Sequence, residues 1–277
     1  MILSNFFFTT TSSQEVICYM RHQDIGFSDW GDPFWGNLPM SKCTRFIYVQ
    51  MDKWAEEGVI NYLVTFKQRT PHAKIFFAYE LHSKHEMIDS TSATDRTMDG
   101  MNLIWSEKIS SPDNSLTKEE RTKYVTRAKS YVQGKEVSQS INCKPGTSEI
   151  MDTEKIVTSV NLTIVFVVVD KEKVTEFLEN PEMCVTPLVN NGVPRNKIAI
   201  GLRELVGYSG RFREVCKKGP MKQMLKDIAK ELSCFVKSTG LYGVMVWYLN
   251  DDDYRNQECG MGKSPFVDAH KPLPTCN

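Results

Sequence analysis

The chain of 277 residues lacks several features that define common classes of protein. It contains no run of about 18–20 apolar residues, the length that spans a bilayer, so we expect no membrane-spanning helix. Lysine plus arginine number 34, as do aspartate plus glutamate, so the formal net charge is zero. A balanced charge provides no general attraction to nucleic acid or to an anionic membrane, and we expect neither as a partner.

Nucleotide-binding and metal-binding patterns are also missing. Neither GxGxxG nor GxxxxGK[ST] follows an apolar run. The eight cysteines include no CxxC pair, which disfavours a zinc ribbon or a thioredoxin-like site. Among the five histidines, His82 and His85 are three residues apart but have no candidate ligands nearby. We therefore expect no metal and no cofactor.

What the chain does contain is a series of short apolar runs separated by polar, helix-like stretches. The runs show little alternation, which is typical of parallel strands covered on both faces. Eight such units fit a single closed (β/α)₈ barrel, whereas six would fit an open doubly wound sheet. The predicted strands are Glu15–Met20, Arg45–Gln50, Lys74–Tyr79, Gly100–Trp105, Glu136–Ile141, Leu162–Val169, Lys197–Leu202 and Gly243–Leu249. The predicted helices are Lys53–Arg69, Lys118–Gln133, Lys171–Asn180 and Met221–Lys237.

The first 14 residues read differently from the rest. A short apolar run, Ile2–Phe8, precedes small hydroxyl residues, and no basic segment comes before it. We interpret residues 1–14 as a weak or incomplete secretory signal, with a disordered tail as the alternative. Residues 15–277 then form the barrel domain.

Five segments match, in order, the motifs of one enzyme family. They are ICYM (17–20) with KCTRFIYVQ (42–50), MDGMNLIWSE (98–107), VNNGVPRNKIAIGL (189–202), FREVC (212–216), and GVMVWYLNDDDY (243–254) with CGMGKSPFVDA (259–269). Together they resemble the chitinases of glycosyl hydrolase family 18. The last segment closely resembles the eighth strand and tail of that family, and the matches span most of the chain.

The resemblance implies a specific chemistry. The family cleaves β-1,4-linked N-acetylglucosamine polymers with retention, and the acetamido oxygen of the substrate itself attacks the anomeric carbon. A glutamate protonates the leaving oxygen, while neighbouring aspartates orient and stabilise the acetamido group. The signature FDGxDxDWE spaces these acids two residues apart on the fourth strand, so alternate side chains point into the barrel.

The signature acids are largely missing from this chain. The first aspartate matches Asp99, but the next two fall on Asn102 and Ile104, and the glutamate falls on Ser106. Serine cannot act as a general acid near neutral pH. Glu107 is a rescue candidate, but a shift of one residue turns a strand side chain to the opposite face unless a β-bulge re-aims it. We therefore expect no catalytic residue in this signature.

Other positions that the resemblance assigns to ligand binding are partly retained. Asp170 matches the aspartate after the sixth strand, and Trp247 matches the tryptophan that forms the floor of a sugar subsite. Trp105 matches the tryptophan of the signature. Tyr79 and Glu80 replace a small, glycine-rich strand end, so their bulk should narrow the cleft.

The walls of the cleft are also expected to differ. Only Arg203–Arg211 separates Leu202 from FREVC, so the small α+β domain that the family inserts there is lacking and the groove should be shallow. Trp30, Phe34 and Trp35 follow the first strand. They suit stacking on sugars, a partner interface or a local loop core.

Cysteine pairing follows from the resemblance for two bridges. It implies Cys18–Cys43 between the first two strands and Cys216–Cys259 near the tail. Disulfides belong in an oxidising compartment, so we expect an extracellular protein. No partner is assigned to Cys143, Cys184, Cys234 and Cys276.

These observations lead to one expected function and two alternatives. We expect a secreted, monomeric, non-catalytic chitinase-like protein that binds an N-acetylglucosamine-type glycan or an extracellular protein and modulates immunity. One alternative is a weak or altered glycoside hydrolase that uses Glu107 or Asp170. The other is a protein-binding effector whose groove is occluded by Tyr79 and Glu80.

Overall fold

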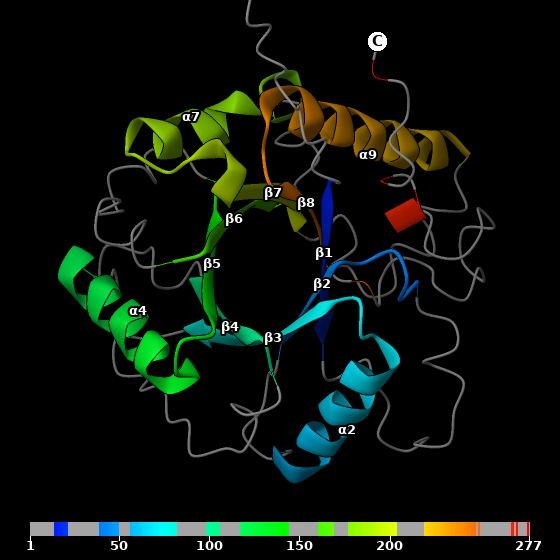
Figure 1. Cartoon of the computed structure of the whole chain (residues 1–277). Coiled ribbons are helices and arrows are strands. Elements are labelled where there is room, and N and C mark those ends of the chain that lie inside the picture. Colours follow the sequence, from blue (N-terminus) through cyan, green and yellow to red (C-terminus); the bar gives the residue numbers. More distant parts are fainter. Residues whose placement is uncertain are drawn as a thin grey trace, which may run out of the picture.

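A computed structural model shows a closed barrel of eight parallel strands, paired in chain order from β1 to β8 and back to β1 (Figure 1). It describes residues 14–21, 39–49, 56–81, 98–105, 117–143, 160–168, 177–203, 219–247, 249, 267–268, 270 and 276. The strands are β1 Glu15–Arg21, β2 Arg45–Val49, β3 Lys74–Leu81, β4 Gly100–Trp105, β5 Glu136–Asn142, β6 Leu162–Val168, β7 Ile198–Arg203 and β8 Gly243–Trp247. The helices are α2 Glu56–Arg69, α4 Lys118–Val132, α7 Glu182–Asn190 and α9 Gly219–Thr239, with a 3₁₀ turn, η4, at Arg195–Lys197.

The predicted (β/α)₈ barrel is confirmed, and each predicted strand end lies within two residues of the observed one. Of the predicted helix Lys171–Asn180, residues 177–179 are helical and residues 171–176 lie outside the described part. Helix α7 was not predicted. It begins after Pro181 and contains Pro187, two residues that disfavour a helix in a sequence pattern. Residues 204–218, where an inserted domain is expected to be missing, also lie outside the described residues.

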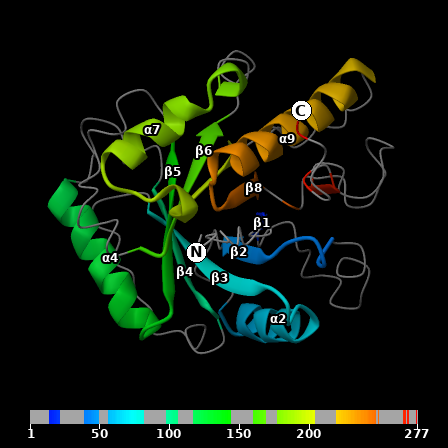
Figure 2. The same cartoon turned by 45° about the horizontal axis from the view of Figure 1, so that its top comes forward.

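The strands are buried on both faces, which explains their nearly continuous apolar sequence. Along β1, Val16 and Cys18 belong to the core between the barrel and the helices, whereas Ile17 and Tyr19 belong to the core inside the barrel. The described helices lie around the outside of the barrel (Figures 1 and 2), and α9 contacts β7 and β8. None of the described helices is long and apolar enough to cross a membrane.

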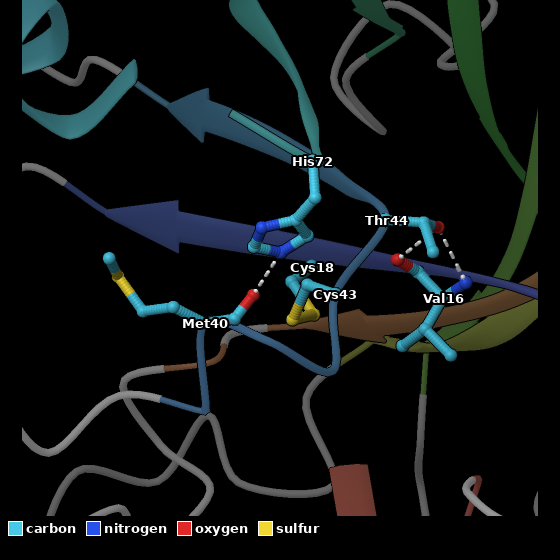
Figure 3. Close-up of a disulfide and its surroundings, with 6 residues drawn as sticks. All are labelled: Val16, Cys18, Met40, Cys43, Thr44 and His72. Carbon is cyan, nitrogen blue, oxygen red and sulfur yellow. Dashed lines mark hydrogen bonds between the residues drawn. A yellow bond between two sulfur atoms is a disulfide. The ribbon is translucent and has the colours of Figure 1, made fainter. Parts of the chain in front are cut away.

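Within the described residues, three disulfides join segments that are distant in sequence. Cys18 of β1 and Cys43, just before β2, form the predicted bridge (Figure 3). Beside it, the Thr44 hydroxyl accepts a hydrogen bond from the Val16 amide and donates one to the Val16 carbonyl. His72 Nε2 lies 2.9 Å from the Met40 carbonyl oxygen on the other side.

The other two bridges pair cysteines that the sequence left unassigned, and every cysteine within the described residues is bonded. Cys143 after β5 binds Cys184 of α7, and Cys234 of α9 binds Cys276. The predicted partners Cys216 and Cys259 lie outside the described residues.

An ion pair with one buried partner lies at the amino-terminal end of the barrel. Arg45 opens β2 and is 3% exposed, and its Nη2 atom donates to Glu136 Oε2 at 2.9 Å and to the Tyr242 hydroxyl at 3.1 Å. Its guanidinium lies 4.2 Å from the centroid of the Phe76 ring. Burial by itself raises the pKa of Glu136, but hydrogen bonds and charges from Lys74 and Arg45 outweigh burial and hold that pKa below its ordinary value.

Candidate functional site

The fourth strand carries the aligned signature, and its inward-facing positions are those that the resemblance requires. Asn102 and Ile104 are completely buried, and Ile104 belongs to the core inside the barrel together with Trp247 and Phe166. The described part of the signature, Gly100–Trp105, therefore places Asn102 and Ile104 inside the barrel. Ser106 and Glu107 lie outside the described residues.

Asn102 is the centre of a neutral hydrogen-bond network inside the barrel. Its Oδ1 atom accepts hydrogen bonds from Ser138 Oγ at 2.8 Å and Ser140 Oγ at 3.2 Å. Its Nδ2 group donates to Ser140 Oγ at 2.8 Å, and the Tyr19 hydroxyl bonds the same serine. An amide and three hydroxyls thus satisfy one another where the family signature has a carboxylate. A network of this kind is stable in a dry interior because its members leave one another few unmet hydrogen bonds.

Asp99, the one retained signature acid, has a structural position. It lies just before β4, at the amino-terminal end of the barrel. Its Oδ2 atom accepts a hydrogen bond from the Ile75 amide at 2.7 Å and pairs with Lys67 of α2. The carboxylate therefore joins α2 to the β3–β4 pair and lies at the end of the barrel opposite the carboxyl ends of the strands.

Trp105 and Tyr79, which the sequence proposed for ligand binding, lie on the outer face of the strands. Trp105 donates from Nε1 to Gln139 Oε1 at 3.1 Å, and the Arg121 guanidinium lies 5.3 Å from its ring. Tyr79 packs against the core between barrel and helices. Strand side chains alternate, so these odd-numbered residues point away from the interior that Asn102 and Glu80 face.

Trp247 faces inward at the end of β8. Its ring centroid lies 4.3 Å from that of Tyr19 and 5.6 Å from that of Phe166. The residue is only 3% exposed. Part of the cover comes from Arg203, the last residue of β7, whose guanidinium lies 4.4 Å from the Trp247 ring centroid and 5.2 Å from that of Phe166.

An ion pair joins Arg203 to the opposite wall of the barrel. Its Nη2 atom lies 3.5 Å from Oε1 of Glu80, and the two side chains are 14% and 9% exposed. Strands β7 and β3 are separated by three strands in either direction, so the pair crosses the interior near the carboxyl ends of the strands. The sequence predicted a bulky side chain at Glu80 but gave no sign that Arg203 is its partner. No local pattern connects two residues on opposite strands.

The described residues offer no acid–base pair for glycoside hydrolysis at this end of the barrel. Within the described strands, Glu80 is the one carboxylate that faces inward near the carboxyl ends, and Arg203 holds it. Asp170, Trp30, Phe34 and Trp35, which the sequence proposed for ligand contact, lie outside the described residues.

No sequence-family profile matches the chain, and no curated protein sequence matches it. Solved structures do resemble it over nearly its whole length. Catalytic domain 2 of the Group II chitinase of Ostrinia furnacalis, a mutant in complex with a chitooligosaccharide, has a TM-score of 0.68 at 16% identity, covering 94% of this chain and 96% of that one.

Two further structures are related in the same way. Human YKL-39, described as a pseudo-chitinase with retained chitooligosaccharide binding properties, has a TM-score of 0.66 at 13% identity, with coverage of 94% and 99%. The immunomodulatory active chitinase TsES1 of Trichuris suis has a TM-score of 0.68 at 12% identity, with coverage of 94% and 100%. The fold is therefore that of chitinases and chitinase-like proteins, a group that contains active and inactive members.

Proposed function

We propose that this chain is a non-catalytic, chitinase-like protein of glycosyl hydrolase family 18 that acts outside the cell by binding an N-acetylglucosamine-type glycan. One observation carries the proposal: the inward-facing positions of β4 hold Asn102 and Ile104, a neutral amide and an aliphatic side chain. In the aligned signature the position of the glutamate falls on Ser106, and a serine cannot act as a general acid near neutral pH.

The reaction of the family needs what these positions lack. Substrate-assisted cleavage requires an acid for the leaving oxygen and a carboxylate that orients the acetamido group. Loss of a general acid alone typically lowers the rate by about 10²–10⁴-fold. The amide of Asn102 is hydrogen-bonded to Ser138 and Ser140, and the side chain of Ile104 can neither donate nor accept a hydrogen bond. At these positions the chain therefore lacks the acid and the carboxylate that the reaction of the family requires.

Glycan binding without cleavage is supported by the structural neighbours. YKL-39 is described as a pseudo-chitinase that retains chitooligosaccharide binding, so this fold binds such sugars after loss of activity. Three disulfides support an oxidising, extracellular environment.

The observed ion pair favours a second candidate function. Glu80 and Arg203 close the interior over Trp247, so a protein-binding effector with an occluded sugar groove fits the same geometry. The immunomodulatory chitinase among the structural neighbours belongs to the same fold group. A third candidate, weak hydrolysis through Glu107, is disfavoured because Glu107 lies one position past the aligned glutamate, and a shift of one residue along a strand turns the side chain to the opposite face.

Calorimetric titration of the full chain with chitohexaose tests the proposal. We expect saturable binding of chitohexaose and none of cellohexaose, which has the same linkage but lacks acetamido groups. If chitooligosaccharides of four to six sugars all fail to bind, the glycan function is rejected and the protein-partner candidate remains.

A further inference from the structure

The aromatic surface at the end of the barrel is already occupied by a side chain of the protein. Sugar rings bind tryptophan through the flat face of the indole, and a guanidinium binds the same kind of face through its charge. Arg203 lies 4.4 Å from the centroid of the Trp247 ring and also contacts the ring of Phe166. A sugar ring and the guanidinium cannot occupy this place together.

The position of Arg203 is fixed from the opposite wall. Glu80 lies 3.5 Å from its Nη2 atom, and little of either side chain reaches solvent. Ion pairs with so little exposure are screened weakly by salt, and breaking them leaves a poorly solvated charge. The guanidinium is therefore held by the two rings of Trp247 and Phe166 and by the carboxylate of Glu80.

Four described polar groups below this pair are already engaged with one another. Asn102, Ser138, Ser140 and the Tyr19 hydroxyl bond one another, and Ile104 is apolar. A sugar that displaced Arg203 would gain the indole face but no hydrogen bond from these residues.

From this geometry we infer that Arg203 and Glu80 are specificity-determining residues that exclude sugar rings from Trp247 and confine glycan binding to the rim of the barrel. The inference rests on the proposed function and deepens it. When a binding surface is open in only a fraction of molecules, the apparent affinity falls by that fraction. Removal of the guanidinium therefore adds a subsite and tightens chitohexaose binding on the order of tenfold.

Two variants open the site in different ways. Arg203→Ala removes the guanidinium, and Glu80→Gln keeps the shape of the side chain but removes its charge. Arg195→Ala is the control because it removes an arginine that pairs with Glu182, at 2.9 Å, away from the barrel interior. Urea unfolding curves are recorded first, and only the variants that still unfold in a cooperative transition are used.

Two measurements are made on each variant. The first measurement is acrylamide quenching of the fluorescence of Trp247, which reports how accessible this residue is without any glycan. The signal of Trp247 is the part of the fluorescence that is lost when Trp247→Phe is added to the variant. The second is the affinity for chitohexaose. We expect Arg203→Ala to increase both, Glu80→Gln to increase both by less, and Arg195→Ala to change neither.

The outcomes separate this inference from the proposed function. If the wild-type protein binds chitohexaose and Arg203→Ala binds it no more tightly, the inference is overturned and the proposed function stands. If only Arg203→Ala binds the sugar, the inference is supported and the glycan function of the wild type is rejected. Unchanged quenching in Arg203→Ala also overturns the inference, whatever the sugar does.

Discussion

At the scale of single residues, Asn102 shows most clearly how a position that aligns with a family acid is used in this barrel. It is completely buried and holds the hydroxyls of Ser138 and Ser140. An aspartate at this position would bring a charge into the interior, whereas the amide makes the same contacts without one. The residue that replaces a family acid has therefore become part of the packing of the core.

Asn102→Leu should lower the free energy of unfolding by about 1–3 kcal/mol, because two buried hydroxyls lose their partner. Urea denaturation followed by circular dichroism measures the change. Asn180→Leu, the same substitution at an exposed position, should cost less than about 0.5 kcal/mol. Equal stability of Asn102→Leu and the wild type would contradict the role assigned to the network.

Glu136 provides a second test at the residue scale. Its pKa in the folded protein lies below the ordinary value of 4.5, so its ion pairs stabilise the fold above that pH and lose their effect as pH falls through the lower, folded pKa. Glu136→Gln should therefore be less stable than the wild type by about 1 kcal/mol near pH 6, with a difference that shrinks toward pH 3. Unfolding free energies measured across this range would refute the assignment if the difference stayed constant.

At the scale of elements, the carboxyl-terminal segment is fastened to α9 by neighbouring contacts. Cys234 and Cys276 form a disulfide, and the adjacent Ser233 hydroxyl lies 2.6 Å from Nδ1 of His270. Val267 and His270 are buried at the same place. Asp268 pairs with Lys42, just before β2, so the segment also reaches the first strands of the barrel.

Protonation of His270 should loosen this attachment. Burial lowers its pKa from 6.5 to about 3, so the folded protein keeps the neutral ring while the unfolded chain binds a proton below pH 6.5. Stability is full above pH 6.5 and falls as pH drops toward 3, by up to about 1.4 kcal/mol per unit.

His270→Gln keeps a hydrogen-bonding group beside Ser233 but removes the titration. Unfolding free energies between pH 7 and pH 5, above the range in which Glu136 titrates, should decline less steeply in this variant than in the wild type. The same slope in both proteins would show that His270 is not the group responsible.

The elements themselves could be predicted to different extents, for physical reasons. The strands are buried on both faces, so most of them are nearly continuous apolar runs, and all eight were located, including the more polar β5. Helix α7 was missed because Pro181 and Pro187 are helix-breaking in a local pattern, while Cys184 and its disulfide hold the helix in place in the folded chain. Local patterns do not contain such long-range constraints.

The candidate site was predictable only where it follows from strand alternation. The inward positions of Asn102, Ile104 and Trp247 followed from the aligned motifs and the period of two. The same rule places Trp105 outward, although the motif alone indicates contact with a ligand. The pair of Arg203 with Glu80 depends on closure of the barrel, which brings together residues from opposite strands and leaves no trace in a local sequence pattern.

The whole molecule is a barrel whose described interior is filled from end to end. Arg45 with Glu136 closes the amino-terminal end, and Arg203 with Glu80 crosses the interior near the carboxyl end. Between the two pairs lie an apolar core and one satisfied polar network. The fold is that of chitinases, and this interior supports the proposal that a glycan binds at the rim of the barrel.

The most direct test of this account is turnover of a fluorogenic chitobioside by the full chain, compared with Glu107→Gln, with an active chitinase as the positive control. We predict that both the wild type and the variant release no fluorophore above the buffer rate at any pH from 4 to 8. Release by the wild type that disappears in Glu107→Gln would show that a carboxylate reaches the scissile bond, and would contradict the account.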